Sequence, residues 1–307
     1  MMDFIRKASP FGQLAILLGL MSVCFMVYGI IFQELFPAIS GGYTMLQAQD
    51  PSIIKIPSVA AALRISQFFY TFTVFLVPGA LFALAMERPA QYLGINRGLP
   101  FLQLILSLLI LLCSLQLVGA SVEWNKLVGF SQKFEEMEKL AEQQTKALLV
   151  MPDSWTMIRN LFLMALLPAI GEEVFFRGCL QTIVQRLVRN GWVAVLITAI
   201  IFSAVHLQFI TFLPRVVLGF AIGAVFLVTG NLWLAIAAHF LNNGMQVVLF
   251  YLYQNKLISK DPSADETVPV YLAIFSALIT GLLIWRLQQR AKQAGYNWKT
   301  ALAGPKN

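Results

Sequence analysis

The sequence predicts an all-α fold: a polytopic membrane bundle of about eight transmembrane helices with a buried polar site. Of the 307 residues, 58% are hydrophobic and 12% are charged, which is roughly half the ~25% charged fraction of soluble domains. Several stretches of about 18–22 residues carry no charge and could cross a hydrocarbon core of about 30 Å as helices. A few ionisable side chains interrupt these stretches, which predicts the buried polar site.

Eight apolar stretches are the predicted spans, in chain order. We expect them at 13–35, 65–86, 101–121, 156–176, 192–208, 212–229, 231–253 and 268–287. The first follows a positively charged start with no small-residue cleavage site, which predicts a retained signal anchor. The fourth is expected to continue as a helix to Arg189. Three cysteines lie inside apolar segments and are expected to stay unpaired: Cys24, Cys113 and Cys179.

Two polar segments connect the spans. Residues 36–60 contain proline, glycine and serine and are expected to form a loop. Residues 131–149 are rich in helix formers and carry acid–base pairs at helical spacing, which predicts a solvent-exposed helix. The net charge of +7 is attributed to juxtamembrane lysine and arginine, because no basic stripe with interleaved aromatic residues indicates nucleic-acid binding.

Lysine and arginine also predict the orientation in the lipid bilayer. An even number of spans places both termini on one side, and that side carries the larger share of basic residues. Because basic loops stay in the cytoplasm, both termini are expected to be cytoplasmic. We therefore expect a multi-pass protein of the cell inner membrane.

Ionisable side chains at membrane depth are concentrated in three places. Glu172, Glu173 and Arg177 lie in the stretch AIGEEVFFRGC, and the only two histidines of the chain are His206 and His239. A charge at membrane depth is costly, so these groups are functional candidates. Both histidines lie on spans that follow closely after the glutamate pair.

Helical spacing assigns the first roles. Glu173 and Arg177 are four residues apart with the acid first, which favours an ion pair that either supports the site or only staples the helix. Glu172 has no partner on its own helix and is the candidate general base or acid. Pro168 lies four residues before it and is expected to kink the helix.

The later spans supply further polar groups. His239 and Asn243 are four residues apart, so both can face one side and steady an oxyanion. Phe202 precedes His206 by one turn. Each signal has a plainer reading: a histidine that bonds between helices, or an asparagine that caps a helix beside Gly244. Three arginines near span ends are expected to snorkel toward the membrane surface: Arg64, Arg159 and Arg215.

Three ordered motifs together resemble a known family. They are Glu172-Glu173-Val-Phe-Phe-Arg177, Phe202-Ser-Ala-Val-His206 and His239-Phe-Leu-Asn242-Asn243. This set resembles the CPBP intramembrane proteases, the family of the type II CAAX prenyl endopeptidases and their bacterial relatives, also called Abi proteins. The resemblance divides the chain into N-terminal helices with the polar helix near 131–149 (1–154), a CPBP-like core (155–253), and a last span with a basic tail (254–307).

The resemblance implies an intramembrane endopeptidase that hydrolyses a peptide bond of a membrane-embedded or lipid-anchored protein. By its motifs, Glu172 and His206 would activate water, and His239 and Asn243 would stabilise the oxyanion. Glu173, Arg177 and Phe202 would support them. The cofactor stays open: none, or a zinc ion held by Glu172, His206 and His239, since two histidines and a carboxylate leave a fourth position free.

Other functions are weighed on the same residues. A non-proteolytic membrane scaffold or bacteriocin-immunity factor could keep the site only for binding. A proton-coupled transporter would predict inverted repeats, and the sequence has none. The sequence also lacks His-Glu-x-x-His, Gly-x-Ser-x-Gly and a pair of intramembrane aspartates, which excludes the usual zinc, serine and aspartyl proteases.

Overall fold

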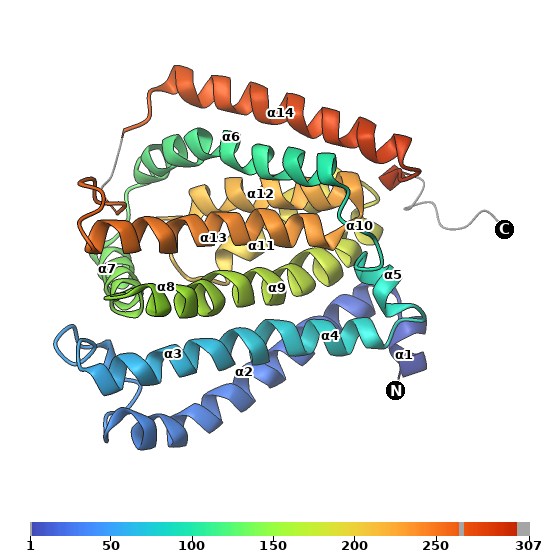
Figure 1. Ribbon diagram of the computed structural model, residues 1–307. Helices are drawn as coiled ribbons and strands as arrows, with labels where there is room; N and C mark the ends of the chain where they lie inside the picture. The colour runs from blue at the N-terminus through green and yellow to red at the C-terminus, as the bar shows by residue number, and fades with distance from the viewer. Residues whose placement is uncertain (1, 264–266, 300–307) are drawn as a thin grey trace.

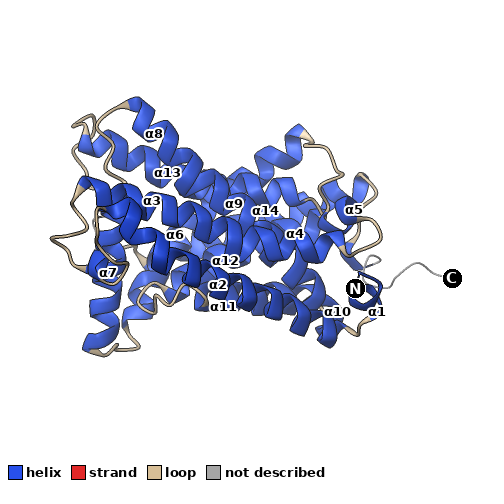
Figure 2. Ribbon diagram, turned by 90° about the horizontal axis from the view of Figure 1, so that it is seen from below, coloured by secondary structure: helices blue, strands red, loops and turns tan. Residues whose placement is uncertain are grey.

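The structure is a computed structural model that describes residues 2–263 and 267–299. Figure 1 shows a bundle of long helices that run side by side, and the described part of the chain contains no strand. Figure 2 shows the connecting loops gathered at the two ends of the bundle. The predicted all-α fold is confirmed.

Every predicted span is occupied by helix. Among the described residues, six helical segments are long and apolar enough to cross a membrane: α2 (Pro10–Ser40), α3 to α4 (Pro57–Leu84), α6 (Phe101–Lys126), α12 (Phe212–Thr229), α13 (Leu232–Gln254) and α14 (Val270–Gln293). The fifth predicted span is the shorter apolar helix α11 (Gly191–Ala204). The fourth is a continuous helical run, Ser154–Val188, which reaches as far as expected.

Two of the spans contain wide, π-helical turns. In the second span, α3 (Pro57–Thr71) passes through η2 (Phe72–Leu76) into α4 (Val77–Leu84). The fourth span runs through α8 (Ser154–Asn160), η3 (Leu161–Leu166), α9 (Leu167–Glu173), η4 (Val174–Gln181) and α10 (Thr182–Val188).

Proline explains two of these wide turns. Pro78 follows η2 and Pro168 follows η3. A proline removes one backbone donor and its ring clashes with the carbonyl four residues earlier, so the preceding turn widens. The distortion expected at Pro168 is therefore present, and it lies on the segment that carries the glutamate pair.

The polar segments differ in how well they were predicted. The helix expected near 131–149 is α7 (Gln132–Leu148), and it lies across the end of the bundle opposite α1 (Figures 1 and 2). The loop expected at 36–60 is shorter: α2 continues through Pro37 to Ser40, and α3 already begins at Pro57. Proline at the first position of a helix is favourable, so the second boundary has a local cause.

Short helices fill the ends of the bundle. They are α1 (Met2–Lys7), the 3₁₀ turn η1 (Gln47–Gln49) and α5 (Pro89–Leu93). Helix α1 and the carboxyl end of α14 lie at the same end of the bundle (Figure 1), as an even number of spans requires. The three cysteines are unpaired, as predicted.

The centre of the bundle is built from α9, η4, α11, α12 and α13. Helix α11 ends at Ala204 and is shorter than α12 and α13, and the chain returns through residues 205–211 into α12. A short helix beside longer ones leaves room at its carboxyl end. This is where the candidate site lies.

Candidate functional site

The glutamate pair of α9 faces two different surroundings. Glu172 is 9% exposed and lines a cavity of about 300 Å³, whereas Glu173 is fully buried. The cavity is bounded by side chains from α6, α9, α11, the 205–211 loop, α12 and α13: Val118, Glu172, Phe202, His206, Thr211, Pro214, Arg215, Leu218, His239, Asn242, Asn243 and Gln246. The structure thus brings all four candidate catalytic residues to one cavity.

Glu173 joins two helices through a single oxygen. Its Oε1 accepts a bond of 2.7 Å from Nη1 of Arg177 and another of 2.7 Å from Nδ1 of His239. The first contact confirms the ion pair expected from the spacing. The second was not expected, and it ties the glutamate pair of α9 to α13.

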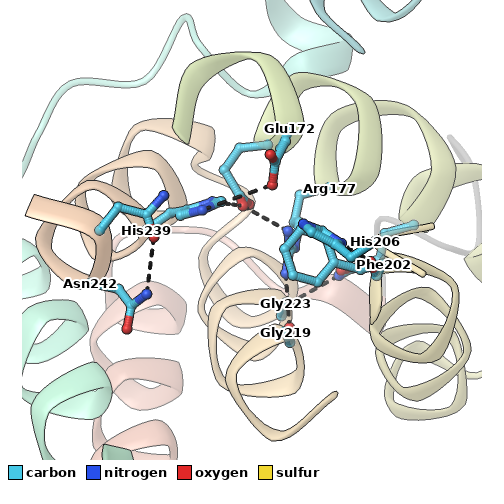
Figure 3. Close-up of polar contacts among 11 residues, drawn as sticks. Glu172, Arg177, Phe202, His206, Gly219, Gly223, His239 and Asn242 are labelled. Carbon is cyan, nitrogen blue, oxygen red and sulfur yellow. Dashed lines mark hydrogen bonds and ion pairs between the residues drawn. The ribbon is translucent and has the colours of Figure 1, made fainter. Parts of the chain in front are cut away.

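The Arg177 side chain is held by contacts with Glu173, Gly219 and Phe202. It is fully buried, its Nη2 donates to the carbonyl oxygen of Gly219 at 3.0 Å, and its guanidinium lies 4.7 Å from the centre of the Phe202 ring. Figure 3 shows the side chain pointing from η4 toward this ring and toward Gly219 of α12. A buried arginine needs such partners, because an unpaired charge in this position is strongly destabilising.

The bond to Glu173 fixes the state of His239. A carboxylate can only accept, so Nδ1 of His239 must carry a proton. The other nitrogen, Nε2, is 3.9 Å from Oε2 of Glu172, across the gap between α13 and α9 (Figure 3). His239 therefore presents Nε2 to the cavity and to Glu172.

His206 is fixed in the same way by a backbone group. It lies two residues beyond the end of α11, not inside the helix as the predicted span 192–208 implied. Its Nδ1 is 2.7 Å from the carbonyl oxygen of Phe202. That carbonyl belongs to the last turn of the helix and has no further helical donor, so the imidazole satisfies it. Nε2 of His206 is left without a proton and lines the cavity.

The local backbone and ring contacts hold His206 in place. The next residue, Leu207, adopts a positive φ of 56°, a strained conformation for a branched side chain that turns the chain away from α11. The imidazole ring packs edge-to-face on Phe202 at 4.9 Å, and Phe202 also meets His239 edge-to-face at 6.1 Å. Phe202 thus separates and spaces the two histidines.

Two neighbouring asparagines complete the α13 side. Nδ2 of Asn242 donates to Oδ1 of Asn243 at 3.0 Å. This contact occupies the oxygen of the Asn243 amide, so its Nδ2 donors are the groups free to face the cavity. The orientation suits the oxyanion role expected of Asn243.

Arg215 corrects an expectation. It was expected to snorkel from a span end, but its guanidinium lines the cavity near the start of α12. Its Nη2 donates to the side-chain oxygens of Gln208 at 2.6 Å and Thr211 at 3.1 Å. The Arg215 side chain is half-buried at this cavity and is held there by these two contacts.

The side chains that line the cavity do not form a metal-binding cluster. Across the described residues, no three His, Cys, Asp or Glu side chains lie close enough together to hold one metal ion. Glu172, His206 and His239 line the same cavity without converging on a common point. The geometry therefore gives the zinc alternative no support.

One comparison with known proteins bears on the segment that carries these residues. Residues 154–245 match the family model described as Type II CAAX prenyl endopeptidase Rce1-like. The chain thus contains an Rce1-like domain. No curated protein and no solved structure matches the chain.

The Rce1-like segment contains every predicted site residue, from Glu172 to Asn243. The match confirms the resemblance that the three motifs indicated. It starts at α8 and ends within α13, so α6 and α7, which also contact the 205–211 loop, lie outside it. The described helices support a multi-pass membrane protein, and residues 154–245 are similar to a family of endopeptidases.

Sequence reasoning missed one further residue that shapes the site. Asn125, near the end of α6, donates through Nδ2 to the carbonyl oxygens of Phe209 at 2.9 Å and Ile210 at 2.6 Å. Its Oδ1 accepts from the backbone of Leu213 at 3.1 Å. Asn125 is buried and fastens the loop that carries His206. Its only sequence signal is an amide at the end of an apolar span.

Proposed function

We propose that the protein is an intramembrane endopeptidase in which Glu172 and His206 activate water for attack on a peptide bond. The observation that carries this proposal is the direction of three side chains. Glu172, His206 and His239 line one cavity, and each histidine has its far nitrogen engaged by a fixed acceptor. The Glu172 carboxylate and Nε2 of each histidine are therefore held in position to contact a substrate in the cavity.

Water activation uses two acceptors. The Glu172 carboxylate has no hydrogen-bond donor from the protein among the described residues, and its nearest charged neighbour is His239 at 3.9 Å. Nε2 of His206 carries no proton because Nδ1 donates to Phe202. A water between these groups would donate one hydrogen to each, and Glu172 would take the proton as the oxygen attacks the carbonyl carbon.

Oxyanion stabilisation uses two donors from α13. Asn243 offers its amide hydrogens, since Asn242 occupies its oxygen. His239 can donate from Nε2 only as the imidazolium, because Nδ1 already donates to Glu173. The developing negative charge on the carbonyl oxygen is then met by a cation and an amide.

The last step returns the proton. When the tetrahedral intermediate collapses, the carbon–nitrogen bond breaks and the nitrogen takes up the proton held by Glu172. The Glu172 carboxylate is regenerated, and the two products are a carboxylic acid and an amine. The acid then gives its proton to the amine, which leaves a carboxylate and an ammonium group. Glu173 and Arg177 take no part in bond changes; they hold His239 and Phe202 in position.

The fold also supports a proposal for the substrate class and the location. A cavity enclosed by spanning helices accepts peptides that are themselves embedded in the membrane or anchored to it by a lipid. We infer a multi-pass protein of the cell inner membrane with both termini in the cytoplasm, because the bundle end that holds α1 and the end of α14 also carries basic side chains such as Arg6 and Arg290.

The proposal is tested by replacing the reactive carboxylate. In cells that carry Glu172→Gln, membrane proteomics should find uncleaved termini of the substrate proteins, with turnover reduced about 10²–10⁴-fold. The matched control is Glu34→Gln, the same change at an exposed site of α2, which should leave the termini as in wild type. Full processing in the Glu172→Gln cells would sink the assignment.

A binding role without turnover makes a different prediction. If the cavity only binds a partner, a His206→Ala, His239→Ala double variant would still rescue a deletion strain. The endopeptidase requires that it does not. The variant is compared with wild type for membrane abundance, so that loss of the protein is not mistaken for loss of activity.

A further inference from the structure

Arg215 is the one charged side chain of the cavity that the proposed hydrolysis does not use. The lining contains one carboxylate, Glu172, two histidines and this arginine. Glu172 has a role in water activation. The cation therefore needs a function of its own.

The contacts of Arg215 are all with uncharged groups. Nη2 donates to Gln208 and Thr211, and Nη1 makes one long contact of 3.4 Å with the carbonyl oxygen of Gln208. No carboxylate oxygen of the described residues lies within 4.0 Å of the guanidinium. Nε and one hydrogen of Nη1 have no protein acceptor there.

A second carboxylate stands behind these contacts. Thr211, which accepts from Arg215, donates its own hydroxyl hydrogen to Oε1 of Glu138 in α7 at 3.0 Å. Oε2 of Glu138 is buried and has no partner. Glu138 therefore lies one hydroxyl group away from the Arg215 guanidinium but does not occupy its free donors.

An arginine held in this way is an incomplete anion site. Arg215 is half-buried, and a guanidinium partly withdrawn from water among uncharged groups is stabilised by a negative partner. The planar fork of donors matches a carboxylate, which can accept two parallel bonds. The polar neighbours fix the arginine before the ligand arrives, so little side-chain entropy is lost on binding.

We propose that Arg215 binds a carboxylate of the substrate close to the scissile bond. This inference rests on the proposed endopeptidase function and specifies the peptides it accepts. The carboxylate comes either from the carboxyl terminus of the peptide or from an aspartate or glutamate side chain near the cleaved bond. In both cases Arg215 determines specificity, because a peptide with an uncharged group there leaves the cation unpaired.

The first test measures binding, so that it does not depend on turnover. The probes are two matched pairs: acetyl-Leu-Val-Phe as the free acid or the amide, and acetyl-Leu-Asp-Phe-amide or its asparagine analogue. They are titrated into the purified full-length Glu172→Gln protein in nanodiscs. In at least one of the two pairs, the peptide with the carboxylate should bind about tenfold to a hundredfold more tightly than its uncharged analogue.

The second test assigns the preference to Arg215. Adding Arg215→Gln should remove the difference between acid and amide, and Arg215→Lys should retain a reduced difference, because lysine keeps the charge but not the fork. Arg286→Gln is the control, since this arginine is exposed on α14; the difference should persist. Equal binding of both members of both pairs by the Glu172→Gln protein overturns the proposal, whether or not the Arg215 variants fold.

Turnover separates this inference from the proposed function. If wild-type protein in proteoliposomes cuts peptides with and without the carboxylate equally well, Arg215 has no role in specificity, even though the endopeptidase is real. If the carboxylate is preferred in binding and Arg215→Gln abolishes the preference, but no peptide is cut, the anion site stands and the endopeptidase fails.

Discussion

Helices α2 and α12 are both long and apolar, yet they have opposite surroundings. Of the residues in the apolar span of α2, 11% are buried inside the bundle, against 67% for α12. On α12, a methyl group on Gly223 would lie 2.9 Å from Oε1 of Gln181 and 3.1 Å from Val195. On α2, a methyl group on Gly29 would meet nothing within 4 Å. The outer helix faces lipid, whereas the central one is packed against its neighbours.

This difference shows what marks the centre of a membrane bundle. Apolarity alone does not indicate burial, because lipid tails are as apolar as a protein core. Small residues that allow close approach, and polar groups with partners on other helices, do indicate it. Gly219 shows both features: its backbone approaches α11 closely, and its carbonyl oxygen accepts a hydrogen bond from Arg177.

The largest expected difference between the two regions concerns buried charge. Arg177→Met leaves Glu173 without its ion-pair partner in a fully buried place, so we expect a loss of about 3–5 kcal/mol in the free energy of unfolding. The same change at the exposed Arg286, which lies over Trp285, should cost at most about 1 kcal/mol. Thermal unfolding of both variants in detergent measures the contrast.

Equal stability losses in these two variants would break the comparison. They would mean that the Glu173–Arg177 pair is no more important for the fold than a surface arginine. A double variant, Glu173→Gln with Arg177→Met, sharpens the result: it removes both charges and should be more stable than Arg177→Met alone.

A smaller effect is expected where the outer part of the chain meets the central part. Asn125→Ala removes three hydrogen bonds to the stretch from Phe209 to Leu213 and should loosen the loop that carries His206. We expect turnover to fall about tenfold to a hundredfold with little change in KM, because a shift of about 1 Å in a catalytic group is enough for such a loss.

The matched control for this variant is Asn160→Ala. Asn160 is also buried, but its amide donates to Leu148, away from the cavity. Both variants should lose stability. Only Asn125→Ala should lose more turnover than its loss of stability accounts for. If the two variants lose activity to the same degree, Asn125 is a structural residue and does not position His206.

The smallest expected effect concerns the difference in packing between α12 and α2. Gly223→Ala should destabilise the protein by about 1–3 kcal/mol, since the added methyl group overpacks the contact with Gln181 and Val195. Gly29→Ala has open space and a better helix former, so it should be neutral or stabilising by up to about 1 kcal/mol. The unfolding midpoints of the two variants measure these changes in stability. If Gly29→Ala were destabilising and Gly223→Ala were not, the assignment of outer and central helices would be reversed.

Much of the fold could be predicted because each span is a local pattern. A run of apolar residues forms a helix in lipid whatever its neighbours are, since every backbone group must be bonded within it. The boundaries were less certain: the sequence suggested a loop from residue 36, but α2 continues through Pro37 to Ser40. Continued bonding at a helix end depends on contacts that a single segment does not specify.

The candidate site was predicted in part for the same reason. Glu173 and Arg177 are one turn apart, so helix geometry alone brings them together at 2.7 Å. The bond between Glu173 and His239 joins residues that are 66 positions apart. No spacing rule predicts it, because it depends on how α13 packs against α9.

Local sequence patterns were therefore enough to predict the helices, the membrane class of the protein and the residues that could react. Which of those residues meet depends on the packing of the helices against one another. It turned Glu173 toward His239, placed Arg215 inside the cavity, and let Asn125 of α6 hold the loop of His206. The physical reason is range: the helical repeat fixes neighbours one turn apart, whereas contacts between helices depend on the close packing of small residues, such as Gly219 and Gly223, along the whole length of each helix.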